Sequence, residues 1–186
     1  CKGDQPPVKD PINGWYTRGW RRSTDPDSGR VRMVYEGEYY TLDPGCPMPR
    51  VKRGTAAACA LYTVVYLLSA VFVSAGAMWR WVGLFQILTL VPLIYFILGT
   101  VRLCLSGERM TFRDYHAGPL RLRKAAGWCT IFGLCTLGAE LVYILLLAGA
   151  IGRELLYVLE ILVYTALSAG VRHYFRRVPC RIEGGE

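Results

Sequence analysis

Two acidic residues, Glu140 and Glu160, stand inside stretches that otherwise contain only apolar and small polar side chains. Glu140 lies nine residues before, and Glu160 eight residues after, the turn that we expect around residues 149–152. At about 1.5 Å of rise per residue, both carboxyl groups lie roughly 12 to 14 Å from that turn, on adjacent antiparallel helices. Two carboxyls at the same depth do not readily ionise together, so this pair could share a proton or hold a cation.

Other polar side chains accompany these two acids. Tyrosines lie one helical turn from an acid, on the same helical face: Tyr143, Tyr157 and Tyr164. In an earlier apolar stretch Gln86 follows Arg80 by six residues, which places it roughly 9 Å from the same side of the bundle. Ser69 or Tyr66 could reach this layer as well. The sequence therefore predicts one buried polar site to which all four apolar stretches contribute.

Three interpretations of this site stay open. The protonated acids could hydrogen-bond to each other and to Tyr or Gln, which would hold the helices together at about 0.6 kcal/mol per contact. They could instead form a pathway for protons or cations, because ionisable groups near the bilayer centre are costly and are typical of such pathways. They could also pair with Arg153, Arg80 or a helix of another protein.

The elements that must position these residues are four apolar stretches, at 55–78, 81–101, 125–151 and 155–171. Roughly 20 apolar residues cross a hydrocarbon layer of ~30 Å as a helix. Helices are expected because lipid offers the backbone no hydrogen-bond partners, and the stretches are too long for the strands of a barrel. The sequence thus predicts an all-α membrane protein, a bundle of four transmembrane helices arranged as two hairpins, at 54–102 and 125–174.

Basic residues predict the orientation of this bundle. Two lie in the short connections on one side, Arg80 and Arg153, and thirteen lie on the other: Arg50, Lys52, Arg53, Arg102, Arg109, Arg113, Arg121, Arg123, Lys124, Arg172, Arg176, Arg177 and Arg181. We therefore expect a multi-pass protein of the cell membrane with both termini cytoplasmic. The net charge of +8 then reflects topology and attraction to anionic lipids. Nucleic acid is not an expected partner, since no base-reading module accompanies the charge.

The cytoplasmic tail, residues 1–53, divides into a flexible part at 1–14 and an aromatic part at 15–42. In the second part, alternation over 31–35, a turn at Glu36-Gly37 and the residues 38–42 predict a small β-hairpin. Such a hairpin is marginal alone, so its aromatic side chains should pack on the bundle, the membrane or a partner. A second short tail, residues 175–186, follows the last helix.

The middle loop, residues 103–124, is the other extramembrane segment. Thr111 followed by Asp114 predicts a capped short helix, which Gly118-Pro119 should interrupt. Five basic residues of this loop should contact lipid headgroups: Arg109, Arg113, Arg121, Arg123 and Lys124.

The seven cysteines do not suggest a disulfide framework or a metal site. Most lie in or beside the expected helices or on the reducing side, and no CxxC or Cys/His spacing occurs. Cys1 could be a lipidated first residue or the edge of a fragment, and the ten Lys and Arg of residues 1–53 favour the second. We expect no metal and no cofactor.

No set of residues has the spacing of a catalytic site, and we do not expect an enzyme. The favoured function is that of an accessory or scaffold protein, acting through protein partners or as a homo-oligomer in a bilayer with anionic lipids. The alternative is a small proton-coupled transporter that uses Glu140 and Glu160.

Overall fold

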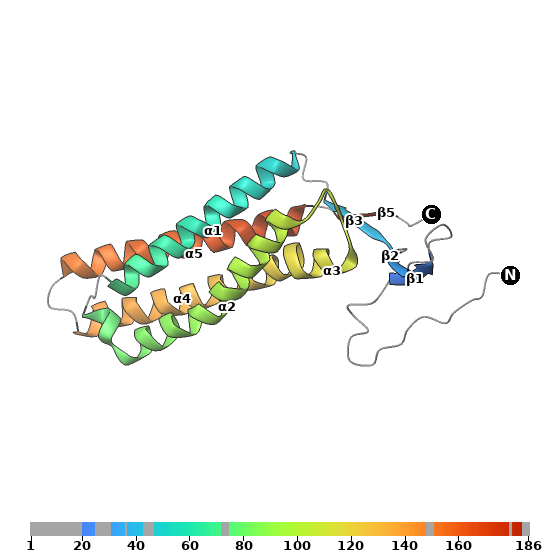
Figure 1. Cartoon of the computed structure of the whole chain (residues 1–186). Coiled ribbons are helices and arrows are strands. Elements are labelled where there is room, and N and C mark those ends of the chain that lie inside the picture. Colours follow the sequence, from blue (N-terminus) through green and yellow to red (C-terminus); the bar gives the residue numbers. More distant parts are fainter. Residues whose placement is uncertain are drawn as a thin grey trace.

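The computed structural model of the chain describes residues 20–24, 31–35, 37–42, 47–71, 75–147, 151–178 and 180–183. The flexible segment expected at 1–14 and residues 149–150 of the turn expected at 149–152 lie outside these residues. Within them, four long helices form a bundle: α1 (Met48–Val71), α2 (Arg80–Leu105), α4 (Arg121–Leu147) and α5 (Ile151–Arg177). Figure 1 shows these helices side by side, with the strands gathered at one end.

The helices pack in a closed ring, α1 against α2, α2 against α4, α4 against α5, and α5 against α1. Small residues permit the closest approaches. A Cβ on Gly99 of α2 would lie 3.0 Å from the backbone nitrogen of Leu122 in α4, and the hydroxyls of Thr130 and Ser168 join α4 to α5 at 3.0 Å. Contacts of this kind are typical of helices that associate in lipid, where burial of apolar surface gives little driving force.

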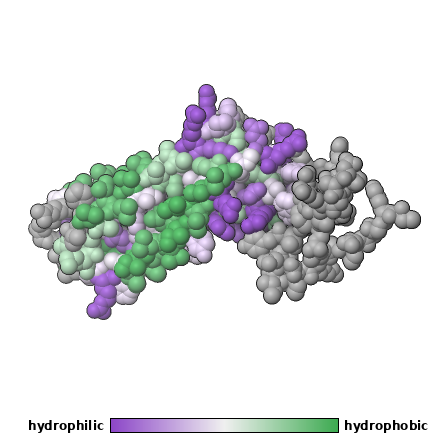
Figure 2. Space-filling model, in the orientation of Figure 1, coloured by the Kyte–Doolittle hydropathy of each residue, from purple (hydrophilic) through white to green (hydrophobic). Residues whose placement is uncertain are grey.

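The surface of the bundle is apolar and its interior holds many polar side chains. Large apolar side chains are exposed along all four helices, among them Leu61, Ile87, Leu145 and Leu159. In Figure 2 they form a hydrophobic band along the long helices, and hydrophilic residues gather beside the strands. By length and composition, four helices within the described ranges can cross a membrane. The fold is thus compatible with an all-α bundle and consistent with a multi-pass membrane protein, with small strands at one end.

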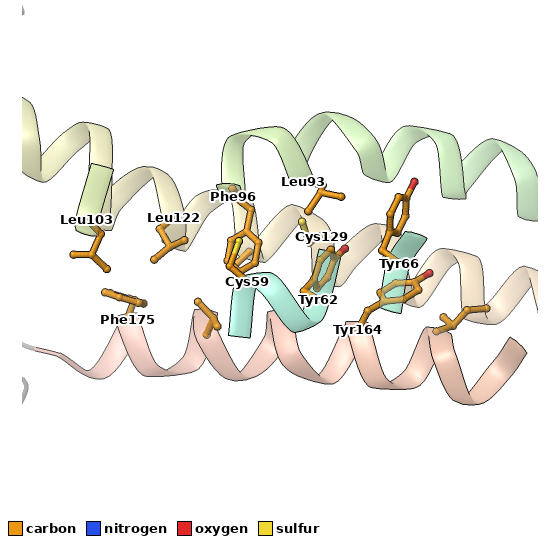
Figure 3. Packing of buried hydrophobic residues seen from close by; sticks show 14 of the residues in the cluster. Cys59, Tyr62, Tyr66, Leu93, Phe96, Leu103, Leu122, Cys129, Tyr164 and Phe175 are labelled. Atoms are coloured by element: carbon orange, nitrogen blue, oxygen red, sulfur yellow. The ribbon is translucent and has the colours of Figure 1, made fainter. Parts of the chain in front are cut away.

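The bundle core contains rings as well as aliphatic side chains. Near the middle of the bundle the ring of Tyr164 packs edge to face against Tyr62 and Tyr66, with centroids 5.5 and 5.9 Å apart, and the rings of Tyr62 and Tyr66 stack on each other at 6.4 Å. Figure 3 shows them beside Phe96, Cys59 and Cys129, whereas Leu103, Leu122 and Phe175 form a separate layer.

Three strands from distant parts of the chain form a sheet at one end of the bundle. The central strand β3 (Tyr39–Leu42) pairs antiparallel with β4 (Arg109–Met110) and with β5 (Cys180–Glu183). We call this end of the bundle the sheet end. The other, where the 3-10 helix η1 (Gly76–Met78) joins α1 to α2, we call the far end. The N-terminal tail, the middle loop and the C-terminal tail thus meet at the sheet end.

The hairpin expected between 31–35 and 38–42 is wrong in its pairing. Strand β2 (Val31–Tyr35) pairs with β1 (Trp20–Thr24), from Trp20 opposite Tyr35 to Thr24 opposite Val31. Residues 39–42 belong to the three-stranded sheet instead. Strand alternation is a local signal, but the choice of partner depends on which segments the bundle brings together.

The middle loop differs from the expectation at one point. Thr111 caps the short helix α3 (Phe112–Tyr115), and its side chain accepts a hydrogen bond from the Asp114 amide at 3.3 Å, which confirms the predicted cap. Gly118-Pro119 does not interrupt the helix. A π-helical turn, η2 (His116–Leu120), accommodates Pro119 and leads directly into α4, because the wider turn tolerates a residue without an N–H.

At the sheet end the helices extend beyond the apolar stretches. Helix α1 begins at Met48 rather than at residue 55, and Lys52 in its second turn donates hydrogen bonds to the carbonyls of Cys104 and Ser106 at the end of α2. A cation is favoured there because the last carbonyls of a helix carry partial negative charge. Basic side chains thus extend the helices past the residues that hydropathy marks.

Candidate functional site

Two buried acids meet near the far end, and they are Glu140 and Glu154. Glu140 belongs to α4 and is fully buried, while Glu154 lies in the first turn of α5 and is 4% exposed. Both carboxyl groups lie at Gly76 of η1: Glu154 accepts a hydrogen bond from its amide, and a Cβ there would lie 2.7 Å from the carboxyl carbon of Glu140. Ionised carboxylates only accept hydrogen bonds, so a hydrogen bond between the two would need a proton on one of them. We call Glu140 and Glu154 the acid pair.

Glu154 also holds the connection between α1 and α2. Its two carboxyl oxygens accept hydrogen bonds from the backbone amides of Ala75 and Gly76, at 3.1 and 3.4 Å. Those amides begin the 3-10 helix η1, whose own N-cap residue, Ala75, makes no side-chain cap. Glu154 therefore caps η1 from another helix, and a carboxylate is well suited to the free N–H groups of a helix start.

Glu140 packs directly on Gly76. A Cβ on Gly76 would lie 2.7 Å from the carboxyl carbon of Glu140, closer than atoms can approach without a shift. Among the described residues, neither oxygen of Glu140 has a hydrogen-bond donor. Because two buried carboxyls that lie close together do not readily ionise together, the acid pair is suited to holding a proton.

A second polar cluster lies beside the acid pair and centres on Gln86 of α2. The Tyr157 hydroxyl donates to Gln86 Oε1 at 2.8 Å, and Gln86 Nε2 donates to the Ser69 hydroxyl at 3.1 Å. The Tyr66 hydroxyl donates to the Gln86 backbone carbonyl at 2.6 Å. We call these four residues the glutamine cluster. It joins α1, α2 and α5, so it brings together four residues that the sequence analysis expected in one buried polar site.

Three other residues expected in the polar site lie elsewhere. Glu160 is only half-buried, and one of its oxygens is buried without a hydrogen-bond partner among the described residues. The ring of Tyr143 lies 6.0 Å from that of Trp79, and Tyr164 belongs to the tyrosine group of the core. The structure thus places Glu140 and Glu154 together at Gly76, and no hydrogen bond within the described residues joins Glu140 to Glu160.

The periodicity of α5 explains why Glu154 and not Glu160 faces the interior. The buried positions of α5 recur at spacings of three and four: Glu154, Tyr157, Ile161, Tyr164, Ser168, Val171 and Phe175. Glu154 starts this stripe and Glu160 lies at its edge. The sequence analysis missed Glu154 because it stands just outside the apolar stretch at 155–171. Extending the stripe by one turn toward the N-terminus would have found it.

The five basic residues expected at lipid headgroups all lie toward the sheet end. Arg109 is in β4 and Arg113 in α3, and both are exposed. Arg123 and Lys124 are exposed in the first turn of α4. Arg121 is half-buried, and its guanidinium lies 5.9 Å from the centre of the Tyr95 ring, within the range of a cation–π contact.

Metal chemistry finds no support in the described ranges. In them, no group of three His, Cys, Asp or Glu side chains lies close enough to hold a metal ion. The thiols of Cys59, Cys104, Cys129 and Cys135 are free, and Cys59 and Cys129 are buried in the core.

Comparison with known proteins gives no relative: no protein-family model matches the chain, and no curated protein or solved structure matches it. Inferences about function therefore rest on the geometry of the bundle, its acid pair and its sheet end.

Proposed function

We propose that the chain is an accessory membrane protein that acts through protein partners bound at its sheet end. The observation that supports this is the three-stranded sheet, which joins β3, β4 and β5 from three separate segments into one unit. Tyr35 extends this unit, because its hydroxyl accepts a hydrogen bond from the Phe112 amide at 3.0 Å. A bundle that needed only to span the membrane would not require its tails and loop to be tied together.

The surroundings of this sheet fit a docking role. The ring of Tyr40 stacks on that of Tyr115 at 4.9 Å, and Tyr35 contacts Tyr39 and Trp20 edge to face. Aromatic side chains supply large contact areas at low entropic cost and are enriched in protein interfaces. On the edge strand β5, Ile182 is 59% exposed. These contacts support a docking role for the sheet end, which carries clustered aromatic side chains and an exposed apolar residue on its edge strand.

The proposed orientation places the sheet end in the cytoplasm. Single-cysteine labelling in a cysteine-free chain tests it, because Arg80 and Arg113 are exposed near opposite ends of the bundle. A membrane-impermeant thiol reagent should label Arg80→Cys in intact cells and should label Arg113→Cys only after the membrane is opened. Labelling of position 113 in intact cells would reverse the orientation.

Crosslinking tests the docking role. A photoreactive amino acid at Ile182 in the sheet is compared with one at Leu145, which is 83% exposed near the far end of α4. We expect a discrete protein adduct in cells from position 182 and none from position 145. An adduct of twice the chain's mass would identify a second copy as the partner. Discrete adducts from position 145 alone would contradict the proposal.

The second candidate is a small proton-coupled transporter, and the acid pair is the observation that favours it. Its proton site would comprise Glu140 of α4 and Glu154 of α5, which both contact Gly76, and Glu160 follows Glu154 by six residues on α5. An amide resembles a protonated acid in size and hydrogen bonding but cannot exchange a proton. Proton flux in liposomes should therefore be lost in Glu140→Gln while the bundle stays folded. Wild-type liposomes without proton flux for any tested substrate would exclude this candidate.

A further inference from the structure

The surface of the bundle contains a groove between α2 and α4 whose two ends differ in chemistry. Its volume is about 660 Å³, and its sheet end is lined by Arg121, Lys124 and His116. The rest of its lining is apolar or aromatic: Leu88, Val91, Pro92, Tyr95, Leu120, Ala125, Trp128 and Phe132. No Asp or Glu is among these described lining residues. The groove therefore matches an amphiphilic ligand: its basic end suits a charged headgroup, and its apolar length suits a hydrocarbon chain.

The length of the groove matches one leaflet of a bilayer. Between Arg121 and Phe132, helix α4 rises about 16 Å at 1.5 Å per residue. Half of the hydrocarbon layer is about 15 Å thick. The basic end lies toward the sheet end, where Figure 2 shows hydrophilic residues adjoining the hydrophobic band. A ligand that enters from the lipid can thus place its head at the basic residues and an acyl chain along the groove.

We propose that this groove is a binding site for one anionic phospholipid. Arg121 and Lys124 supply two permanent charges for the phosphate, and the contact of Arg121 with the Tyr95 ring fixes the guanidinium at the mouth of the groove. A zwitterionic lipid would bring its own cation toward these charges. A free phosphate would leave the apolar length, including the 56% exposed Trp128, without a ligand.

The basic residues of the loop are not equivalent in this respect. Arg121 and Lys124 are three residues apart and share one face of α4, whereas Arg123 does not line the groove. Arg123 lies on the same turn, is exposed and carries the same charge. Substitution of Arg123 therefore measures attraction to the membrane surface in general, whereas substitution of Arg121 or Lys124 measures binding in the groove.

Trp128 supplies the measurement. The full chain, with its other four tryptophans replaced by Phe, is reconstituted into phosphatidylcholine vesicles that contain a minor fraction of bromine-labelled lipid, which quenches nearby indole fluorescence. We expect brominated phosphatidylglycerol to quench Trp128 more than its mole fraction predicts, and brominated phosphatidylcholine only in proportion. Each of Arg121→Gln and Lys124→Gln should weaken this preference roughly fivefold, the equivalent of one Lys or Arg contact with an anionic surface. Arg123→Gln and the charge-conserving Lys124→Arg should retain it.

Several outcomes would overturn the proposal. Equal quenching by both headgroups would show an ordinary annular surface, and an equal loss in Arg123→Gln would show attraction to surface charge alone. Displacement of the brominated lipid by soluble glycerol phosphate would reassign the basic end to a free phosphate ligand. Absence of quenching by either lipid would mean that a second copy or another protein segment covers the groove.

Discussion

Replacing Glu154 with Leu should destabilise the bundle, although the change removes a charged group from an apolar interior. The reason is the pair of hydrogen bonds that its carboxyl accepts from Ala75 and Gly76 at the start of η1. Gly76 is buried, so its amide would be left without an acceptor, whereas Ala75 is exposed and can turn to water. An orphaned buried N–H costs about 1 to 3 kcal/mol. We expect a loss of that size in the free energy of unfolding.

Glu160→Leu is the matched control on the same helix. Glu160 is half-buried, its one buried oxygen has no hydrogen-bond partner in the described ranges, and no donor is orphaned when it is removed. Its replacement should change the free energy of unfolding by no more than about 0.5 kcal/mol. The sequence-based pairing of Glu140 with Glu160 predicts the opposite order of the two variants.

A third variant, Glu140→Gln, separates capping from proton sharing. Its amide can donate to the Glu154 carboxyl without a shared proton, so stability should be kept or rise slightly. The assay is equilibrium unfolding of the purified proteins in mixed micelles by added dodecyl sulfate, followed by circular dichroism. A loss in Glu160→Leu equal to or larger than that in Glu154→Leu would refute the reasoning.

Two further predictions concern the far end and the sheet end. Gly76→Ala should lower the free energy of unfolding by about 1 to 3 kcal/mol in the same assay, because its Cβ meets the fully buried Glu140. The control is Gly138→Ala, whose Cβ meets nothing within 4 Å and which should be neutral or stabilising. Equal effects of the two substitutions would mean that Glu140 can move aside. At the sheet end, Leu42 lies opposite Cys180, so Leu42→Cys should form a disulfide with Cys180 on mild oxidation in a chain otherwise free of cysteine. A chain with Leu42→Cys and Val31→Cys as its only cysteines should not form a disulfide, although the hairpin expected from the sequence would place these two residues opposite each other.

The membrane-spanning helices could be predicted from the sequence because their signal is continuous and local. Each apolar stretch lies inside or largely overlaps a helix of the structure, with only the ends displaced. Residues 76–78 were expected to continue the first helix and instead form η1. The amide of Gly76 there is held by Glu154, a residue 78 positions away, and no local pattern reveals such a contact.

The strand partners show the same limit. The segments 31–35 and 39–42 both alternate and both form strands, yet Thr41 pairs with Arg181, which is 140 positions distant. The sequence analysis expected Gln86 and Tyr157 in one buried polar site, and the structure joins them by a hydrogen bond. Counting residues gives the depth of a side chain along the helix axis but not the direction in which it points around that axis. The count therefore selected Glu160 and missed Glu154, which lies on the buried stripe of α5.

The acid pair and the groove lie in opposite halves of the bundle, and this separation makes the proposals independent. From Arg121 to Glu140, helix α4 rises about 28 Å, nearly the thickness of the hydrocarbon layer. Sites this far apart with no shared partner contribute additively to stability. Glu154→Leu should therefore weaken the bundle without changing the headgroup preference at Trp128, and Lys124→Gln should change that preference without weakening the bundle. If either substitution altered both properties, the two ends would have to be coupled through a movement of α4 against its neighbours, and a static scaffold would no longer account for the protein.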